Sequence, residues 1–184
     1  MDWGCRWSGI DTGSLSRVQV GFAGRSFKTP PTSVVDGSGI RVGIVAARFN
    51  QDLVDRLLEH TLAGLADLGV ASSAIEVVRV PGSNEVPVAI QFLAMSDRFD
   101  ACVGLGLIIR GETLHYEIIA HGSSRALQEV AMNTGIPVIN GIIVAENEDQ
   151  AVERCGGRMD RGREFGIAAV EMGALARRFA GNRP

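Results

Sequence analysis

Four apolar runs recur along the chain after residue 40. Each is short and rich in β-branched residues, a composition typical of strands buried on both faces of a sheet. The runs predict strands at Arg41–Ala46, Ile75–Val80, Ala101–Ile109 and Pro137–Val144.

The segments between these runs repeat their apolar residues with helical spacing. Gln51–Leu68 has such a stripe, and Gly69 follows at the position of a helix C-cap. Further helices are predicted at Asn84–Met95, Tyr116–Asn133, Asn147–Arg154 and Glu164–Phe179. The alternation predicts an α/β fold: a single three-layer α/β/α domain with a mostly parallel four-stranded sheet, doubly wound and flavodoxin-like.

Residues 1–39 lack this regularity and are rich in Gly, Ser, Thr and Pro. They predict an extended N-terminal arm or tail in front of the domain at 40–184, with a short strand at Arg17–Phe22. Thr12–Val35 contains no acidic residue, which gives it some likeness to a transit peptide. We expect a cytoplasmic location, with a plastid or another organelle as the alternative.

Composition narrows the function classes. The 184 residues are 46% hydrophobic and 21% charged, with a net charge of −3, so we expect no nucleic-acid partner. No apolar run approaches the roughly 20 residues of a membrane helix, so no membrane partner is expected. Cys5, Cys102 and Cys155 are scattered without metal-ligand spacing, which argues against a disulfide framework or zinc site. Cys102 is expected to be inert packing.

Parallel sheets bind ligands beyond the carboxyl ends of their strands, so the positions to examine follow Ala46, Val80, Ile109 and Ile139. After the first strand, Phe49 can stack on a flat heterocycle, or it can pack as a hydrophobic staple beside a helix cap at Asn50. After the second, Ser83, Asn84 and Glu85 gather at a helix N-terminus, where they suit a polyol or simply cap the helix.

The third loop is the most informative. Gly111 permits a tight turn, and the amides of Glu112 and Thr113 are predicted to open a helix and form an anion site. His115 then lies in the first turn of that helix, where a histidine can move protons near neutral pH. The sequence therefore predicts anion binding combined with proton transfer.

The fourth region offers Asn140-Gly141, then Arg154 on a short helix and Arg161 in a basic turn at Met159–Gly162. Arginine suits a phosphate, although each one alone is more often a solvated surface residue. The chain has no phosphate-binding P-loop, and Gly104-Leu105-Gly106 is a poor dinucleotide signature. We therefore expect neither a cofactor nor a metal.

Together these residues resemble lumazine synthase, in the right order, over about Arg41–Phe179. The likeness rests on Phe49-Asn50, Pro81-Gly82-Ser83-Asn84-Glu85-Val86-Pro87, Gly106–Tyr116, Pro137-Val138-Ile139-Asn140-Gly141, Glu148-Asp149-Gln150-Ala151 with Glu153-Arg154, and Val170-Glu171-Met172. The Pro-Gly-x-x-Glu-x-Pro turn combined with Arg-Gly-Glu-Thr-x-His is highly specific for this family.

The resemblance implies a transferase of riboflavin biosynthesis that condenses 5-amino-6-(D-ribitylamino)uracil with 3,4-dihydroxy-2-butanone 4-phosphate to give 6,7-dimethyl-8-ribityllumazine. It implies that His115 transfers protons. The pyrimidine and ribityl positions are Phe49, Ser83, Asn84, Glu85, Leu107, Ile108, Ile109 and Asn140, and the phosphate positions are Glu112, Thr113, Arg154 and Arg161.

The resemblance also implies a homo-oligomer, because Arg154 and Asn140 would serve a neighbouring subunit's pocket. The family forms pentamers, some of which assemble into icosahedral shells of about 60 subunits. The arm can add a strand to an adjacent subunit's sheet, as the family's does. Two alternatives stay open: an archaeal-type riboflavin synthase, and a non-catalytic shell-forming or flavin-binding paralogue.

The sequence departs from the family pattern at four positions. Asn84 and Asn140 stand where many members carry an aromatic residue, Arg161 where a lysine is common, and Leu107 where some relatives have a smaller or hydroxylated residue. The two asparagines would weaken the grip on the pyrimidine, whereas Arg161 preserves the positive charge.

Overall fold

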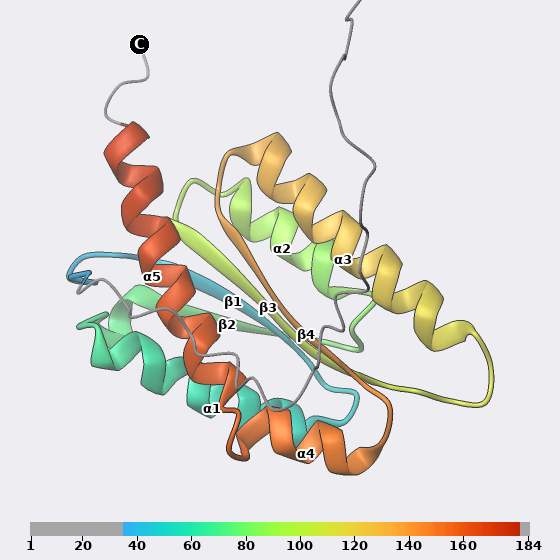
Figure 1. The fold of residues 1–184 in the computed structure, drawn as a ribbon. Helices are drawn as coiled ribbons and strands as arrows, with labels where there is room; N and C mark the ends of the chain where they lie inside the picture. The colour runs from blue at the N-terminus through green and yellow to red at the C-terminus, as the bar shows by residue number, and fades with distance from the viewer. Residues whose placement is uncertain (1–34, 181–184) are drawn as a thin grey trace, which may run out of the picture. The chain divides into compact units, whose positions relative to one another are not determined.

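The computed structural model describes residues 35–180, and its centre is a four-stranded sheet (Figure 1). The strands are β1 (Val42–Ala47), β2 (Ile75–Val80), β3 (Ala101–Ile109) and β4 (Val138–Ala145). They are all parallel and lie in the order β2-β1-β3-β4. This doubly wound order confirms the predicted α/β class and changes direction between β1 and β3, which is the usual ligand position in such sheets.

Two helical layers cover the sheet (Figure 1). One face carries α2 (Val86–Ala94) and α3 (His115–Thr134), and the other carries α1 (Gln51–Asp67), α4 (Glu148–Gly156) and α5 (Arg161–Ala180). A single 3-10 turn, η1 (Ser72–Ala74), precedes β2. Among the described residues, no helix is long and apolar enough to cross a membrane.

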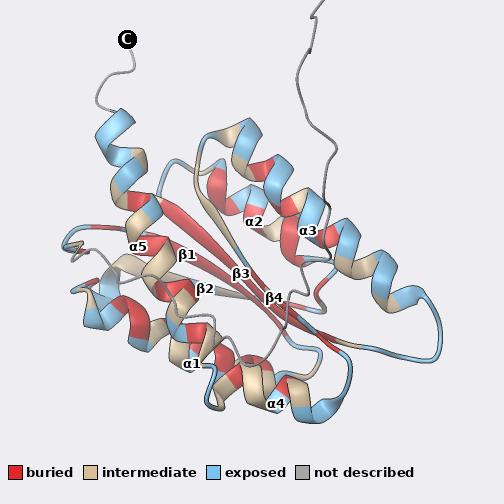
Figure 2. Cartoon of the chain, viewed as in Figure 1, coloured by how far each residue is buried: buried red, intermediate tan, exposed pale blue. Residues whose placement is uncertain are grey.

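Alternation along the strands sends successive side chains into two separate cores. In β1, Val42 and Ile44 pack with α1, α4 and α5, whereas Val45 packs with α2 and α3. Figure 2 shows the result as a continuous band of buried residues along the central strands. Because β1 and β3 are buried on both faces, the polar groups that could serve a ligand lie where these strands end.

Most predicted boundaries are confirmed within two residues, and the helix ends follow the expected signals. Gly69 and Gly135 adopt positive φ after α1 and α3, and the Asn147 side chain accepts a 2.9 Å hydrogen bond from Gln150 N–H at the start of α4. Residues 1–34, with the predicted strand at Arg17–Phe22, lie outside the described part of the chain.

Two boundary predictions are wrong. Helix α5 begins at Arg161 rather than Glu164, because Asp160 Oδ1 accepts from Arg163 N–H at 3.2 Å and starts the helix earlier. The loop expected to begin after Ile139 is also wrong, although the strand predicted at Pro137–Val144 is confirmed: Asn140 lies inside the fourth strand. It pairs with Gly104 in the middle of β4, which continues to Ala145. The amide of Asn140 replaces an apolar side chain on the strand without ending it.

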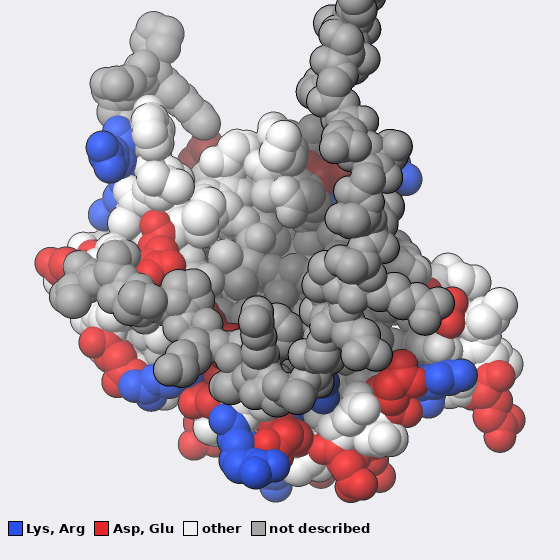
Figure 3. All heavy atoms as spheres, in the orientation of Figure 1, with Lys and Arg blue, Asp and Glu red and all other residues white. Residues whose placement is uncertain are grey.

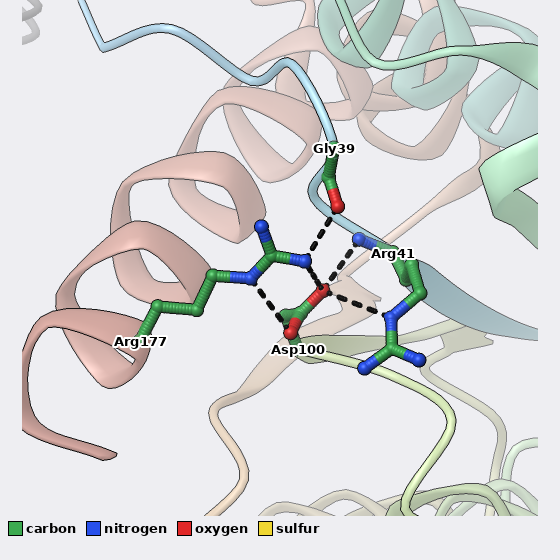
Figure 4. A network of polar contacts seen from close by, with 4 residues as sticks. All are labelled: Gly39, Arg41, Asp100 and Arg177. Carbon is green, nitrogen blue, oxygen red and sulfur yellow. Dashed lines mark hydrogen bonds and ion pairs between the residues drawn. The ribbon is translucent and has the colours of Figure 1, made fainter. Parts of the chain in front are cut away.

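The amino end of the sheet is held by a polar cluster around Asp100 (Figure 4). Its carboxylate accepts hydrogen bonds from Arg177 at 2.9 and 2.7 Å and from Arg41 N–H at 2.7 Å, and Arg177 also donates to Gly39 C=O. The cluster ties the last helix to the start of β1, at the end of the sheet opposite the carboxyl ends.

Acidic and basic side chains are mixed along the lower rim of the view in Figure 3. Ion pairs join neighbouring elements of the described chain, such as Arg79 with Asp55 and Arg163 with Asp67. Exposed pairs of this kind contribute little to stability individually.

Candidate active site

The candidate site begins where β1 stops and β3 continues. The pairing of β1 with β3 ends at Ala46 and Leu105, yet β3 runs on to Ile109 beside β4. Past Ala47 the chain turns toward β2, because Arg48 N–H donates to Val80 C=O at 2.8 Å and Phe49 N–H to Pro81 C=O at 3.0 Å. One side of β3 is therefore uncovered beyond Leu105.

Backbone direction decides which groups face this gap. Ala101 N–H points to the β1 side, whereas Cys102 and Arg110 N–H groups bond to Pro137 and Ala145 on the β4 side. In a parallel strand alternate residues turn to the same neighbour, so Leu107 and Ile109 present their backbone groups to the gap. Ile108 instead pairs its backbone with β4. The Leu107 side chain is buried in the core against α1, α4 and α5. Leu107 therefore presents only its backbone groups to the gap.

Asn50 bridges one part of the gap, at Leu107, in an unexpected way. The sequence predicts it as a helix cap, and it holds the N-cap position of α1, but its side chain makes no capping hydrogen bond. Its amide instead donates to Leu107 C=O at 3.3 Å, where the next β1 amide would have donated. Asn50 has φ 57°, in the left-handed region that asparagine tolerates better than most residues. The turn thus ties the first loop to β3.

The second loop packs directly on β3 through a glycine. Gly106 leaves room for Ser83, because a Cβ added at Gly106 would lie 2.5 Å from Ser83 Oγ. The neighbouring Gly104 similarly admits Val86 at the start of α2, where an added Cβ would lie 2.7 Å from Val86 Cγ1. The two glycines allow the loop and the helix to approach the strand closely.

Ser83 does not cap α2, contrary to the alternative considered from the sequence. It is 7% exposed, and its hydroxyl has no hydrogen-bond partner. Burying a hydroxyl without a hydrogen-bond partner costs free energy. A ligand hydroxyl that bonds to Ser83 Oγ would therefore remove this cost without displacing a protein partner. Glu85 holds the N-cap position of α2 and is exposed, with Asn84 Nδ2 donating to its carboxylate at 3.4 Å. Helix α2 begins at Val86, two residues later than predicted.

The third loop is open. Nothing lies within 4 Å of a Cβ built on Gly111, and Glu112, Thr113, Leu114 and His115 are all exposed. Helix α3 begins at His115, which confirms that the histidine lies in its first turn. The prediction that the amides of Glu112 and Thr113 open the helix is three residues early. They belong to the turn in front of it, and the first helical N–H groups follow at His115 and Tyr116.

Three of the predicted residues lie apart from these loops within one chain. Arg154 Nη1 donates to Gln150 C=O at 3.2 Å in its own helix, and Arg161 pairs with Glu164 and lies 5.6 Å from the Phe165 ring centre. Both arginines belong to the helical layer opposite α2 and α3. Asn140 Nδ2 donates to Ser124 Oγ at 3.1 Å, in a groove of about 300 Å³ between α3 and β4.

Large apolar side chains are exposed around the loops. Phe49 is 69% exposed, Leu114 68% and Ile118 69%. The value for Phe49 excludes the hydrophobic staple within this chain, because a staple would bury the ring against α1. Among residues 35–180, no group of three or more His, Cys, Asp or Glu could hold a metal ion.

Comparison with known proteins identifies this arrangement. The family model of 6,7-dimethyl-8-ribityllumazine synthase matches residues 39–177, which cover the whole described sheet, α1 to α4, and α5 except its last three residues. The chain belongs to this family. A 6,7-dimethyl-8-ribityllumazine synthase from Nitrosomonas europaea is 46% identical over 143 residues, 78% of this chain and 85% of the relative. One from Paraburkholderia phymatum is 42% identical over 142 residues, 77% of this chain and 81% of the relative.

The sequence pattern did not predict the contacts that join the first and second loops to β3. The contact between Asn50 and Leu107 joins residues far apart in sequence, so no local signal predicts it. The contact of Ser83 with β3 does have a signal. Gly106 interrupts a buried strand, and a glycine in a strand often marks a place where another segment approaches closely.

Proposed function

We propose that the chain condenses 5-amino-6-(D-ribitylamino)uracil with 3,4-dihydroxy-2-butanone 4-phosphate to form 6,7-dimethyl-8-ribityllumazine. This is the penultimate step of riboflavin biosynthesis, and it releases phosphate and water. Membership of the lumazine synthase family supports the reaction. The observation that carries it is the convergence of the first three loops on the uncovered end of β3, through the contacts of Asn50 and Ser83.

The uncovered end of β3 is the proposed pyrimidine site. The backbone groups of Leu107 and Ile109 would read the edge of the ring, with Ile108 setting their direction through its pairing with β4. Phe49 is exposed beside this edge and would stack on the ring face. Ser83, Asn84 and Glu85 would hold the ribityl chain, where the unpartnered Ser83 hydroxyl and the Glu85 carboxylate can bond to sugar hydroxyls.

The turn at Gly111 is the proposed phosphate site. The amides of Glu112 and Thr113 and the N-terminus of α3 provide donors and a favourable dipole for an anion. Arg154 and Arg161 lie in the other helical layer of the same chain, so we assign them to the pocket of an adjacent subunit, together with Asn140. There their guanidinium groups would neutralise the phosphate.

The proposed chemistry needs positioning and proton transfer. The primary 5-amino group attacks the ketone carbon, and a first water leaves to give an imine. Phosphate is then eliminated, and the ribitylamino nitrogen closes the second ring with loss of a second water. His115, at the start of α3, would carry protons to and from these intermediates. Orientation of two bound reactants can supply up to about 7–11 kcal/mol of the barrier, whereas acid–base catalysis gives about 10²–10⁴-fold. His115→Ala should therefore slow turnover and leave measurable activity.

The chain is proposed to act as a homopentamer with each pocket between two subunits, and an icosahedral shell is its proposed larger assembly. Exposed apolar side chains support such an interface: Val88, Phe92 and Met95 form a stripe on α2, and Leu114 and Ile118 flank the start of α3. A contact that buries them would remove a large apolar surface from water. Residues 1–39 are proposed to form an arm outside the catalytic domain at 40–184, and the enzyme to be cytoplasmic.

An absorbance assay of the purified protein tests the reaction. With both substrates present, the lumazine chromophore and inorganic phosphate should appear in equal amounts. Omitting the phosphorylated ketone should abolish both. Riboflavin formed from added lumazine alone would point to a riboflavin synthase reaction instead, and no turnover despite tight lumazine binding would indicate a non-catalytic paralogue. Light scattering on the same sample should give a mass of at least five chains, and a monomeric mass would contradict the shared pocket.

A further inference from the structure

Arg110 stands at the base of the phosphate turn and is held there by three contacts. Its N–H donates to Ala145 C=O at 2.9 Å, at the end of β4. Its guanidinium donates to Glu146 at 2.8 Å and lies 6.0 Å from the centre of the Tyr116 ring. Arg110 precedes Gly111 and Tyr116 follows His115, so this contact brings together the two ends of the turn that carries the proposed phosphate donors.

The same residue connects the turn to α4. Glu146 N–H donates to Gln150 Oε1 at 3.1 Å, and the carbonyl of Gln150 accepts from Arg154 Nη1 at 3.2 Å. A path of three hydrogen bonds therefore runs from Arg110 through Glu146 and Gln150 to Arg154. The β3–α3 and β4–α4 connections also leave the same end of the sheet (Figure 1).

We propose that Arg110 and Glu146 form a positioning pair that fixes the phosphate turn relative to the helix carrying Arg154. The inference rests on the proposed function, in which the turn binds phosphate in one pocket and Arg154 serves the next. The pair would then position two groups of the same chain: the turn that binds phosphate in one pocket, and Arg154, which binds phosphate in the neighbouring pocket. Neither residue needs to touch the substrate.

The expected effect of losing the Arg110–Glu146 pair depends on how exposed the two side chains are. Arg110 and Glu146 are 58% and 59% exposed, so their pair adds little to the stability of the fold. No other group packs within 4 Å of a Cβ built on Gly111, so the turn is held by few contacts. Even the weak ion pair of Arg110 with Glu146 therefore reduces the number of conformations that the turn can adopt. We expect loss of the pair to weaken phosphate binding by about 3- to 10-fold without unfolding the protein.

Kinetics of three variants test the pair in the full-length assembly. Arg110→Met and Glu146→Gln should raise the KM for the phosphorylated ketone by about 3- to 10-fold and leave the KM for the pyrimidine within about 2-fold. Arg110→Lys keeps the charge and should recover most of the loss. Equal increases in both KM values, an unchanged KM for the ketone, or no recovery by lysine would each overturn the proposal.

Arg98 provides a matched control at the other end of the sheet. It is 56% exposed, pairs with Glu76 at 2.6 Å and lies 4.9 Å from the Phe99 ring centre, which is the same set of contacts as at Arg110. Arg98→Met should leave both KM values unchanged. If it raises the KM for the ketone as much as Arg110→Met does, the effect is general and the positioning role is wrong.

Direct titration with inorganic phosphate separates this inference from the proposed reaction. The unmodified protein should bind phosphate, and Arg110→Met should bind it about 3- to 10-fold more weakly even if no turnover is found. In that case the reaction would be wrong and the positioning pair would stand. Equal phosphate binding by both proteins would overturn the pair, whatever the activity.

Discussion

Asp100 accepts two hydrogen bonds from Arg177, at 2.9 and 2.7 Å, and so joins the last helix to the loop in front of β3. The Asp100 side chain is only 9% exposed. This contact lies at the amino end of the strands, whereas the candidate site lies at their carboxyl ends. Stability and chemistry can therefore be changed separately in this fold.

Asp100→Asn should destabilise the protein by about 1–3 kcal/mol near pH 7, because charge-assisted hydrogen bonds become weaker and one acceptor oxygen is lost. Urea unfolding measures this change. Asp97→Asn is the matched control, since Asp97 is exposed and asparagine also tolerates its φ of 54°. A loss of stability in the control as large as in Asp100→Asn would contradict a specific role for the cluster.

The same carboxylate predicts a dependence on pH. Burial alone would raise the pKa of Asp100, but hydrogen bonds from Arg177 and Arg41 outweigh it and hold the pKa below its usual value. A carboxyl with a lowered pKa in the folded state stabilises the fold above its unfolded pKa of about 4, and that contribution is lost as the pH falls through the folded value. Stability should fall below about pH 4 less steeply in Asp100→Asn than in the unmodified protein. Identical slopes would contradict this.

Gly106→Ala should disturb the loop that carries the proposed ribityl site, because its new Cβ would lie 2.5 Å from Ser83 Oγ. We expect a loss of about 1–3 kcal/mol in stability and a higher KM for the pyrimidine substrate. Ser83→Ala in the same chain removes the oxygen and should recover part of the stability. Gly122→Ala in α3 meets nothing within 4 Å and should be neutral or slightly stabilising. Full activity of Gly106→Ala would show that Ser83 does not need its observed place.

Asn50→Gly should raise the KM for the pyrimidine several-fold, because it keeps the left-handed backbone but removes the amide that donates to Leu107. Asn50→Ala should show the same kinetic defect and an additional loss of about 1 kcal/mol in stability, since alanine is strained at this φ. Steady-state kinetics and urea unfolding of both variants separate the two effects. An unchanged KM in both would remove Asn50 from the site.

These residues also indicate how far sequence patterns reach. Strand and helix order follow from local periodicity and capping, so the sheet, the start of α3 at His115 and the cap at Asn147 were predictable. The uses of Asn50 and Ser83 were not, because each depends on which segment of β3 lies opposite. The loop expected after Ile139 was wrong for the same reason: the place of a polar residue inside a strand is not known until its partner, here Gly104, is known.

The two described cysteines should be chemically silent. Burial raises the pKa of the Cys102 thiol to about 12 and that of Cys155 to about 11. At pH 8 their thiolate fraction would be roughly one part in a thousand or less. In a Cys5→Ser variant, a disulfide reagent should therefore modify neither thiol in the native protein and both in urea. Rapid modification of one thiol without urea would contradict the packing described for it.

Subunit mixing tests the shared pocket most directly. His115→Ala and Arg154→Ala proteins, each with low activity alone, are unfolded together and reassembled in equal amounts. If the proposed pocket takes His115 from one chain and Arg154 from the next, about a quarter of the pockets should regain both groups, and the mixture should approach a quarter of the normal rate. A mixture no more active than the mean of its two parents would contradict a site built between copies of this chain.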